Sequence, residues 1–274
     1  MSVCWLYKRS FRACFRKMWL KLVTWLTLLQ LLAGAPSQQD KIFGGQTETI
    51  RNYPFMVNLR RGPYFRCGGA LIAPSCVVTA AHCLEGHPQY VEDLYVHAQQ
   101  DCLSDSSPEA HVRQAWFACV APQYNGYTFD ADVAIIKLRQ PFYTAGNVST
   151  VPIDFNDLPE GANLRILGWG MTGSGGQNWG QCLQTANVSL VRRDQCQRQM
   201  NSYGPITNNM LCALGPNATD ACQGDSGSPI LYAGRPVGVV SWGEGCGSGL
   251  PGVYTRFGSS AMSWFLKRFM DTHC

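Results

Sequence analysis

The sequence of 274 residues predicts a protein built mostly from β-strands. It contains 28 glycines and 15 prolines, which favour turns. Its apolar residues form short runs, such as Leu71-Ile72 and residues 237–241, rather than long helical patterns. Short apolar runs separated by frequent turns are typical of all-β domains, and the length suits one large β domain or two small ones.

One helix is predicted near the end of the chain. Ser260 is a candidate N-cap, because a serine hydroxyl can accept a hydrogen bond from a free N–H group of the first helical turn. Four large apolar residues follow it with spacings that suit an apolar face: Met262, Trp264, Phe265 and Phe269. We expect this helix to pack against the strands and to carry no chemistry.

The N-terminal residues predict export from the cell. Six basic side chains lie among residues 8–21, an apolar segment covers residues 18–35, and small residues end it, which is the pattern of a secretory signal peptide over residues 1–35. Met18 is an alternative start for the same signal. A membrane anchor is the other interpretation, but the segment is shorter than the ~20 residues of a spanning helix and contains Lys21 and Gln30.

Charge gives no reason to expect a nucleic-acid partner. The formal net charge is +4, but the first 41 residues hold seven Lys or Arg and one acid, so the remaining residues have a net charge of −2. A domain near neutrality lacks the basic surface with which proteins bind nucleic acid. We therefore expect partners of another kind.

A glycine-rich segment, residues 220–229, gives the strongest chemical signal, with the sequence Asp-Ala-Cys-Gln-Gly-Asp-Ser-Gly-Ser-Pro. Glycines around Ser226 allow a substrate to approach closely. The turn can aim the N–H groups of Gly224 and Ser226 at one point, where a tetrahedral intermediate would place its negative oxygen. Taken alone, such a segment is equally typical of a surface turn.

A histidine and an aspartate complete a candidate catalytic triad. His82 lies among small residues at 79–83, and Asp132 directly precedes an apolar strand pattern at 133–138. Each alone would suggest a packed or capping residue. In the chain order His, Asp, Ser they fit general-base activation of Ser226 by a His82 that Asp132 orients.

At these motifs the chain resembles the trypsin-like (chymotrypsin-fold) serine proteases. The matching segments, in order, are Ile42-Phe43-Gly44-Gly45, Thr79-Ala80-Ala81-His82-Cys83, Asp132 with its apolar strand, Gly168-Trp169-Gly170, the Ser226 segment, Ser241-Trp242-Gly243 and Pro251-Gly252-Val253-Tyr254. The resemblance covers residues 42–274. It implies two packed six-stranded antiparallel β-barrels with a catalytic cleft between them, a C-terminal helix and secreted serine endopeptidase activity.

The resemblance also implies a substrate preference. Asp220 matches the residue at the floor of the primary pocket, and a buried carboxylate favours a cationic Arg or Lys side chain before the scissile bond. Gly243 and Gly252 match the pocket-wall glycines that leave room for a long side chain. The backbone of Ser241 and Trp242 is expected to pair with the substrate as an added strand. The alternative interpretation is that Asp220 is an ordinary acidic residue of a loop, without a role in substrate binding.

A short segment before the protease-like region predicts activation by proteolysis. Residues 36–41 end in Lys41, and cleavage there would create an ammonium group on Ile42. In the family this group pairs with the carboxylate that Asp225 matches, which orders the oxyanion loop. We therefore expect an activation peptide at 36–41 and a nearly inactive precursor.

Thirteen cysteines indicate an oxidising compartment. The resemblance implies the disulfides Cys67–Cys83, Cys196–Cys212 and Cys222–Cys246. By positional analogy we also expect Cys76–Cys119, across neighbouring strands, and Cys102–Cys182. Cys274 would then be free or bonded to another chain.

No cofactor or metal is expected. The spacings contain no zinc-like cluster, and Gln100 and Ala110 lie near positions where some relatives carry acidic calcium ligands, although Asp101, Asp105 and Glu109 remain as acids. Ser228 stands where the family usually has glycine, and we expect it to be tolerated. Three triplets fit the glycosylation pattern, at Asn147, Asn187 and Asn217.

Two other classes compete with the protease interpretation. A binding protein that kept the fold but lost turnover usually shows a replaced triad member, and an esterase would have no need of Asp220 or of a strand-pairing segment. Under the protease interpretation the partners are proteins or peptides with Arg or Lys before the scissile bond, an activating protease and protein inhibitors of proteases.

Overall fold

The computed structural model describes residues 42, 44–85, 91–144, 146–171 and 182–274. The predicted signal peptide and activation peptide, and Lys41 itself, lie outside these residues. Asp40–Cys274 forms one compact unit, which contains all of the described residues. None of the described helices combines the length and the apolar character that crossing a membrane requires.

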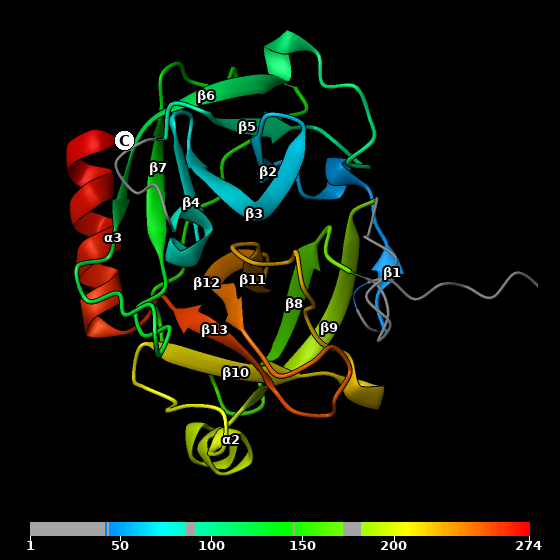
Figure 1. Cartoon of the computed structure of the whole chain (residues 1–274), viewed down its shortest axis with the longest axis vertical. Helices are drawn as coiled ribbons and strands as arrows, with labels where there is room; N and C mark the ends of the chain where they lie inside the picture. The colour runs from blue at the N-terminus through cyan, green and yellow to red at the C-terminus, as the bar shows by residue number, and fades with distance from the viewer. Residues whose placement is uncertain (1–41, 43, 86–90, 145, 172–181) are drawn as a thin grey trace, which may run out of the picture. The chain divides into compact units, whose positions relative to one another are not determined.

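Six antiparallel strands close the first barrel (Figure 1). In the order in which they pair, they are β2 (Met56–Arg61), β3 (Tyr64–Ala73), β4 (Cys76–Thr79), β7 (Ala134–Leu138), β6 (Val112–Val120) and β5 (Leu94–Ala98), and β5 returns to β2. Fully buried aliphatic side chains from alternating positions fill this barrel, among them Leu59, Leu71 and Ile136. The segment carrying His82 leaves β4, and Asp132 lies just before β7.

The second barrel is built from six later strands. They are β8 (Asn163–Gly168), β9 (Gln184–Val191), β10 (Met210–Leu214), β13 (Gly252–Arg256), β12 (Arg235–Trp242) and β11 (Pro229–Tyr232). Because β8 pairs with both β9 and β11, the sheet closes, and the two-residue strand β1 (Gln46–Thr47) is added to β9. The predicted pair of six-stranded barrels is therefore confirmed, and at Asp132 the loop before β7 contacts strands β12 and β13 of the second barrel.

The helices agree with the prediction only in part. The expected C-terminal helix is α3 (Ser260–His273), but its N-cap is Ser259, whose hydroxyl accepts a hydrogen bond from the Met262 N–H group. Trp264, expected on the apolar face, is 61% exposed, because its position faces away from the barrels. A second helix, α2 (Arg193–Met200), was not predicted. Four short 3₁₀ turns complete the elements: η1 (Ile50–Asn52), η2 (Ala81–Leu84), η3 (Glu109–His111) and η4 (Pro216–Ala218).

Five disulfides connect the described cysteines. Cys67–Cys83, Cys102–Cys182, Cys196–Cys212 and Cys222–Cys246 form as expected. The expected Cys76–Cys119 bond is wrong, and so is the expectation that Cys274 is free or bonded to another chain. Cys76 bonds to Cys274 and Cys119 is a free thiol.

The strand order explains the wrong pairing. Cys76 lies on β4 and Cys119 on β6, and β7 separates these strands, so they are not neighbours. Instead, α3 brings the end of the chain back to β4. There the Cys76–Cys274 bond fastens the last residue to the first barrel.

Candidate active site

His82 and Asp132 are joined as the sequence predicts. The Nδ1 atom of His82 lies 2.7 Å from Oδ2 of Asp132, and the His82 backbone N–H donates to Oδ1 at 2.9 Å. The aspartate side chain is fully buried, whereas the imidazole keeps part of its surface exposed. A carboxylate bonded to Nδ1 fixes the tautomer that leaves Nε2 free to accept a proton.

The second barrel holds the same aspartate from the other side. The Ser241 hydroxyl of β12 donates to Oδ2 of Asp132 at 2.6 Å, and the Thr255 hydroxyl of β13 donates to its carbonyl at 2.6 Å. The nearby Asp130 carboxylate accepts hydrogen bonds from Thr207 and Asn209, which precede β10. The loop that carries Asp132 is thus fixed by both barrels.

Ser226 lies on a tight turn at the edge of a pocket. Gly224 and Gly227, on either side of it, have φ values of +93° and +75°, which side chains with a Cβ rarely adopt. A Cβ on Gly227 would also lie 2.2 Å from the Thr79 hydroxyl oxygen. The Ser226 carbonyl accepts a hydrogen bond from the Gly68 N–H at 2.9 Å, so the turn is anchored to strand β3 of the first barrel.

Ser226 itself is partly exposed and shares its surroundings with the His82–Asp132 pair. Ser226, Ser241 and Phe129 line one pocket, and the Phe129 ring meets the His82 ring edge to face, with centroids 5.7 Å apart. In the described part of the chain, no hydrogen bond joins Ser226 to His82. Such bonds are often long in substrate-free enzymes and shorten when substrate binds.

The two N–H groups that were expected to stabilise an oxyanion lack protein partners. Within the described residues, neither the Gly224 nor the Ser226 N–H donates to a protein acceptor, while the N–H of Asp225 between them bonds to the Cys222 carbonyl. Both N–H groups belong to the turn that borders the pocket. They are therefore available to an oxygen atom bound next to Ser226.

The pocket beside Ser226 has a volume of about 340 Å³ and contains a buried carboxylate. Burial raises the pKa of Asp220 to about 8, although its carboxylate accepts hydrogen bonds from the Ala221 N–H at 2.7 Å and the Tyr254 hydroxyl at 3.3 Å. A Cβ on Gly252 would lie 2.3 Å from Oδ1 of Asp220, so glycine keeps that wall open. No positive side chain lines the pocket among the described residues.

Asp225 is a second buried carboxylate, and no cation pairs with it among the described residues. It accepts hydrogen bonds from the N–H groups of Gly170 and Cys222, both at 2.8 Å, and burial raises its pKa to about 7. Cβ atoms on Gly168 or Gly170 would lie 2.0 Å and 2.5 Å from its carboxyl group. Ile42, whose amine the sequence assigns to Asp225, is fully buried in the core of the second barrel.

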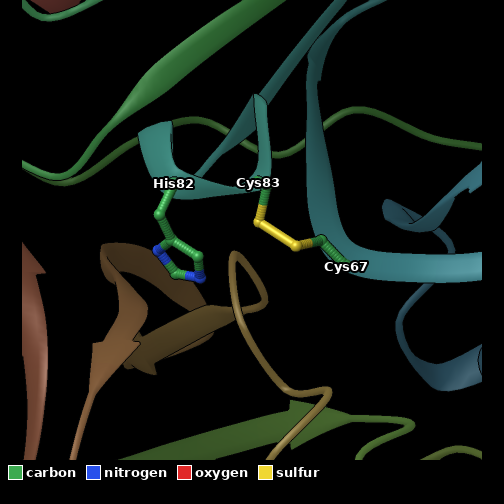
Figure 2. A group of neighbouring side chains, drawn as sticks. All are labelled: Cys67, His82 and Cys83. Atoms are coloured by element: carbon green, nitrogen blue, oxygen red, sulfur yellow. A yellow bond between two sulfur atoms is a disulfide. The ribbon is translucent and has the colours of Figure 1, made fainter. Parts of the chain in front are cut away.

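Cys67, His82 and Cys83 form the one group of three candidate metal ligands found among the described residues. Figure 2 shows the two sulfur atoms bonded to each other beside the His82 ring. Cysteine binds a metal as its thiolate, and the two sulfurs of a disulfide are not thiolates, which leaves His82 as a single ligand here. This group therefore does not have the chemistry of a zinc site.

The loop at 99–109 uses its acids within the protein. Asp101 accepts from the Ile50 N–H at 2.6 Å and Asp105 from the Cys102 N–H at 2.7 Å. The Arg60 guanidinium donates to the Gln100 side chain at 2.9 Å and to the Leu103 carbonyl at 2.7 Å. A fixed cation of the protein thus occupies the inside of this loop.

Some contacts at the site were missed in the sequence. Ser241 was assigned to substrate through its backbone, but its hydroxyl also bonds to Asp132. Tyr254, recognised only as part of a motif, donates to Asp220. The contact of Phe129 with His82 could not be predicted from the sequence, because it depends on a backbone φ of +54°, a value that a phenylalanine seldom adopts.

Ser228 and the three glycosylation triplets can also be placed. Ser228 is fully buried, and its hydroxyl has no partner within the described chain; it lies against Gly68, where a Cβ would come within 1.9 Å of its oxygen. Asn147, Asn187 and Asn217 are all exposed. The surface location that a glycan requires is therefore met at each asparagine.

Comparisons with known proteins agree with this geometry. The family described as Trypsin matches residues 42–265. A trypsin of Xenopus laevis is 37% identical over 234 residues, which cover 84% of this chain and 92% of that trypsin. An anionic trypsin of Bos taurus is 39% identical over 225 residues, covering 79% and 85%. The solved structure of neuropsin, a serine protease expressed in the limbic system of mouse brain, has a TM-score of 0.73 and 29% identity, and the match covers 83% of this chain and all of neuropsin.

Proposed function

Because this chain belongs to the trypsin family of serine proteases, we propose that it is a secreted endopeptidase that hydrolyses peptide bonds after Arg or Lys. The observation that carries the proposal is the arrangement around Ser226. The buried Asp132 bonds to His82, and a pocket bordered by Ser226 contains the buried Asp220, with no cationic side chain among its described lining residues.

In the proposed mechanism, His82 Nε2 takes the proton of the Ser226 hydroxyl while Ser226 Oγ attacks the carbonyl carbon of the peptide bond. The tetrahedral oxyanion accepts hydrogen bonds from the Gly224 and Ser226 N–H groups. His82 then gives the proton to the leaving amine, and the peptide bond breaks to leave an acyl-enzyme. Water attacks the acyl carbonyl by the same route, which releases the acid and restores Ser226. Asp132 stabilises the cationic imidazole throughout.

Asp220 is the proposed origin of the specificity. A carboxylate that is buried in a pocket without a cation gains most from an arginine or lysine side chain that enters there. Gly243 and Gly252 leave room for it, and the end of β12 with Trp242 is the proposed pairing edge for the substrate backbone. An esterase of small acyl groups would gain nothing from Asp220.

Activation is proposed to follow cleavage after Lys41, once a signal peptide at 1–35 has directed the chain out of the cell. The new Ile42 ammonium would neutralise Asp225. Burial raises the pKa of this carboxyl, because its charged form is unfavourable in the interior until a cation pairs with it. Residues 36–41 contain no cysteine, so nothing covalent retains them. An activating protease and protein inhibitors are the partners this scheme requires, and Asn147, Asn187 and Asn217 are proposed glycosylation sites.

The proposal is tested by expressing the precursor, cleaving it after Lys41 and assaying peptide substrates that end in Arg, Lys, Phe or Ala. We expect turnover of the Arg and Lys substrates only after cleavage, together with covalent labelling of Ser226 by an organophosphonate. A Ser226→Ala chain, activated in the same way, is the control and should be inactive with an unchanged melting temperature. A folded protein with a confirmed Ile42 terminus that neither labels nor turns over would instead be a non-enzymatic binding protein of this family.

Specificity has its own test. Asp220→Ser should lower kcat/KM for Arg and Lys substrates by two or more orders of magnitude, because the cationic side chain loses its counter-charge while the triad is untouched. Labelling of Ser226 by a small neutral phosphonate should remain. Equal kcat/KM on Arg substrates before and after the change would exclude Asp220 as the pocket carboxylate.

A further inference from the structure

A second hollow surface lies on the second barrel, apart from the candidate active site. Two adjoining depressions of about 350 and 660 Å³ lie between α2, the ends of β9 and β10, and the loop before β8. They share the lining residues Leu158, Leu190, Arg192, Arg193 and Ile206. We call this surface the α2 groove. None of its lining residues belongs to the pocket beside Ser226.

The floor of the α2 groove is apolar. Ile206 and Met210 are buried, and Leu158 and Leu190 are only partly buried, although each packs against the core of the second barrel. Partly exposed leucines at the bottom of a hollow gain free energy when another apolar side chain covers them.

The charges on the rim are unequally paired. Arg192 contacts both Glu160 and Asp194 at 3.1 Å, and Arg256 pairs with Asp157. Within the described chain, Arg193 makes no ion pair, and its guanidinium donates only to the Asn208 side-chain oxygen at 3.0 Å.

Arg193 is also close to a like charge. Burial and the neighbouring Arg256 lower the pKa of Arg193, while Asp157 acts in the opposite sense. Two guanidinium groups therefore depend on a single carboxylate at this end of the groove. A second carboxylate bound beside Arg193 would balance them, since guanidinium and carboxylate groups can form two parallel hydrogen bonds.

We propose that the α2 groove binds a peptide segment of a partner protein in which a carboxylate lies next to an apolar side chain. The carboxylate bonds to Arg193 and the apolar side chain covers Leu158 and Leu190. A sulfated polysaccharide fits less well, because Asp157, Glu160 and Asp194 on the rim repel a dense polyanion. The proposal rests on this surface and is independent of turnover at Ser226.

The test uses the Ser226→Ala chain, so that turnover at Ser226 plays no part in the measurement. The probe is acetyl-Gly-Leu-Asp-Phe-Gly amide, in which the Asp side chain is the single carboxylate, and binding is measured by isothermal titration calorimetry at low salt. Arg193→Ala should weaken binding about fivefold or more, and replacing Asp by Asn in the peptide should weaken it similarly. Arg268→Ala is the matched control, because Arg268 is an exposed arginine on α3 outside the groove lining, and its loss should leave binding unchanged.

Several outcomes would overturn the proposal. They are no binding at 1 mM peptide, equal binding by the Arg193→Ala chain, or equal binding of the Asp and Asn peptides. Binding of a sulfated oligosaccharide in place of the peptide would also contradict it. Melting temperatures of the two arginine variants should agree with the parent, and Arg193→Gln, which keeps a donor for Asn208, serves if Arg193→Ala unfolds.

Discussion

The buried carboxylates of the two barrels differ in the partners that the protein gives them. Asp132, from the first barrel, accepts hydrogen bonds from the His82 N–H group and the Ser241 hydroxyl and contacts the His82 ring nitrogen. The protein itself therefore supplies partners to both carboxylate oxygens. Asp220 and Asp225, in the second barrel, have two hydrogen-bond donors each, and burial raises their pKa to about 8 and about 7. Within the described chain, no cation pairs with Asp220 or Asp225. This arrangement suits carboxylates whose cation comes from a bound substrate or from a newly formed N-terminus.

The largest expected effect comes from changing Asp132, the carboxylate whose partners the protein supplies. Asp132→Asn should lower kcat on the order of 10⁴-fold, the magnitude that this change has in a serine protease triad, because the amide favours the wrong imidazole tautomer. Single-turnover kinetics on an Arg substrate would measure it. Ser241→Ala removes one donor but leaves His82 bonded, so its effect should be far smaller. If both variants lost the same activity, Asp132 would not be acting through His82.

A smaller effect should appear at Asp220 as a pH dependence. The raised pKa of Asp220 keeps its carboxyl group largely protonated at neutral pH while the pocket is empty. A cationic side chain must therefore bind to the less abundant form of the protein, in which Asp220 is ionised. The ratio of kcat/KM for matched Arg and citrulline substrates should therefore fall about tenfold for each pH unit below pH 8. The ratio cancels any pH dependence that the two substrates share. A ratio that stays constant from pH 6 to 9 would contradict this account.

The smallest effect concerns the stability of the uncleaved precursor. In the folded chain the pKa of Asp225 is about 7, above its ordinary value. Between about pH 4 and pH 7, Asp225 therefore stays protonated in the folded chain, whereas in the unfolded chain its carboxyl group is ionised. Stability is then lost as pH rises from about 4 through 7. Asp220, with a pKa of about 8, adds to this loss. The melting temperature of the precursor should fall by roughly 15 °C between pH 5 and 8, and by a little more than half as much in Asp225→Asn, where Asp220 alone contributes.

Cleavage after Lys41 should remove the contribution of Asp225 to this pH dependence. After cleavage at Lys41, the proposed Ile42 ammonium would hold Asp225 ionised in the folded state, and the extra pH dependence should disappear. Activated protein should therefore match the Asp225→Asn precursor in slope. A precursor and an activated enzyme with the same slope would show that Ile42 does not reach Asp225.

Local sequence was enough to predict the parts of the molecule that chemistry constrains tightly. Glycine at 224 and 227 is required by positive φ, so the glycines around Ser226 already marked a candidate turn in the sequence. Glycine at 252 is required by contact with Asp220, but both residues were assigned to the pocket through the resemblance. The pairing of His82 with Asp132 followed from their order and neighbours. The closed barrels, in contrast, were predicted through resemblance, since strand periodicity indicated only a mostly β protein.

Features that depend on where distant segments meet could not be read from the sequence. The partner of Cys76 is decided by α3 returning to β4, a contact between residues 198 positions apart. The Ser241 hydroxyl reaches Asp132 because β12 and the loop before β7 face each other across two barrels. The Arg193 imbalance arises from pairings that place Asp157 with Arg256 and Asp194 with Arg192. In each case, spatial neighbourhood rather than local pattern is decisive.

The bond between Cys76 and Cys274 also makes most of the chain a covalent ring. Any single cut between these two residues, including one in a surface loop, leaves both pieces attached to each other. A protease that meets other proteases, and copies of itself, would thus keep its fragments together after nicking. Damaged molecules would migrate as one species until reduced, and a nick that spares the site would leave an assembled enzyme.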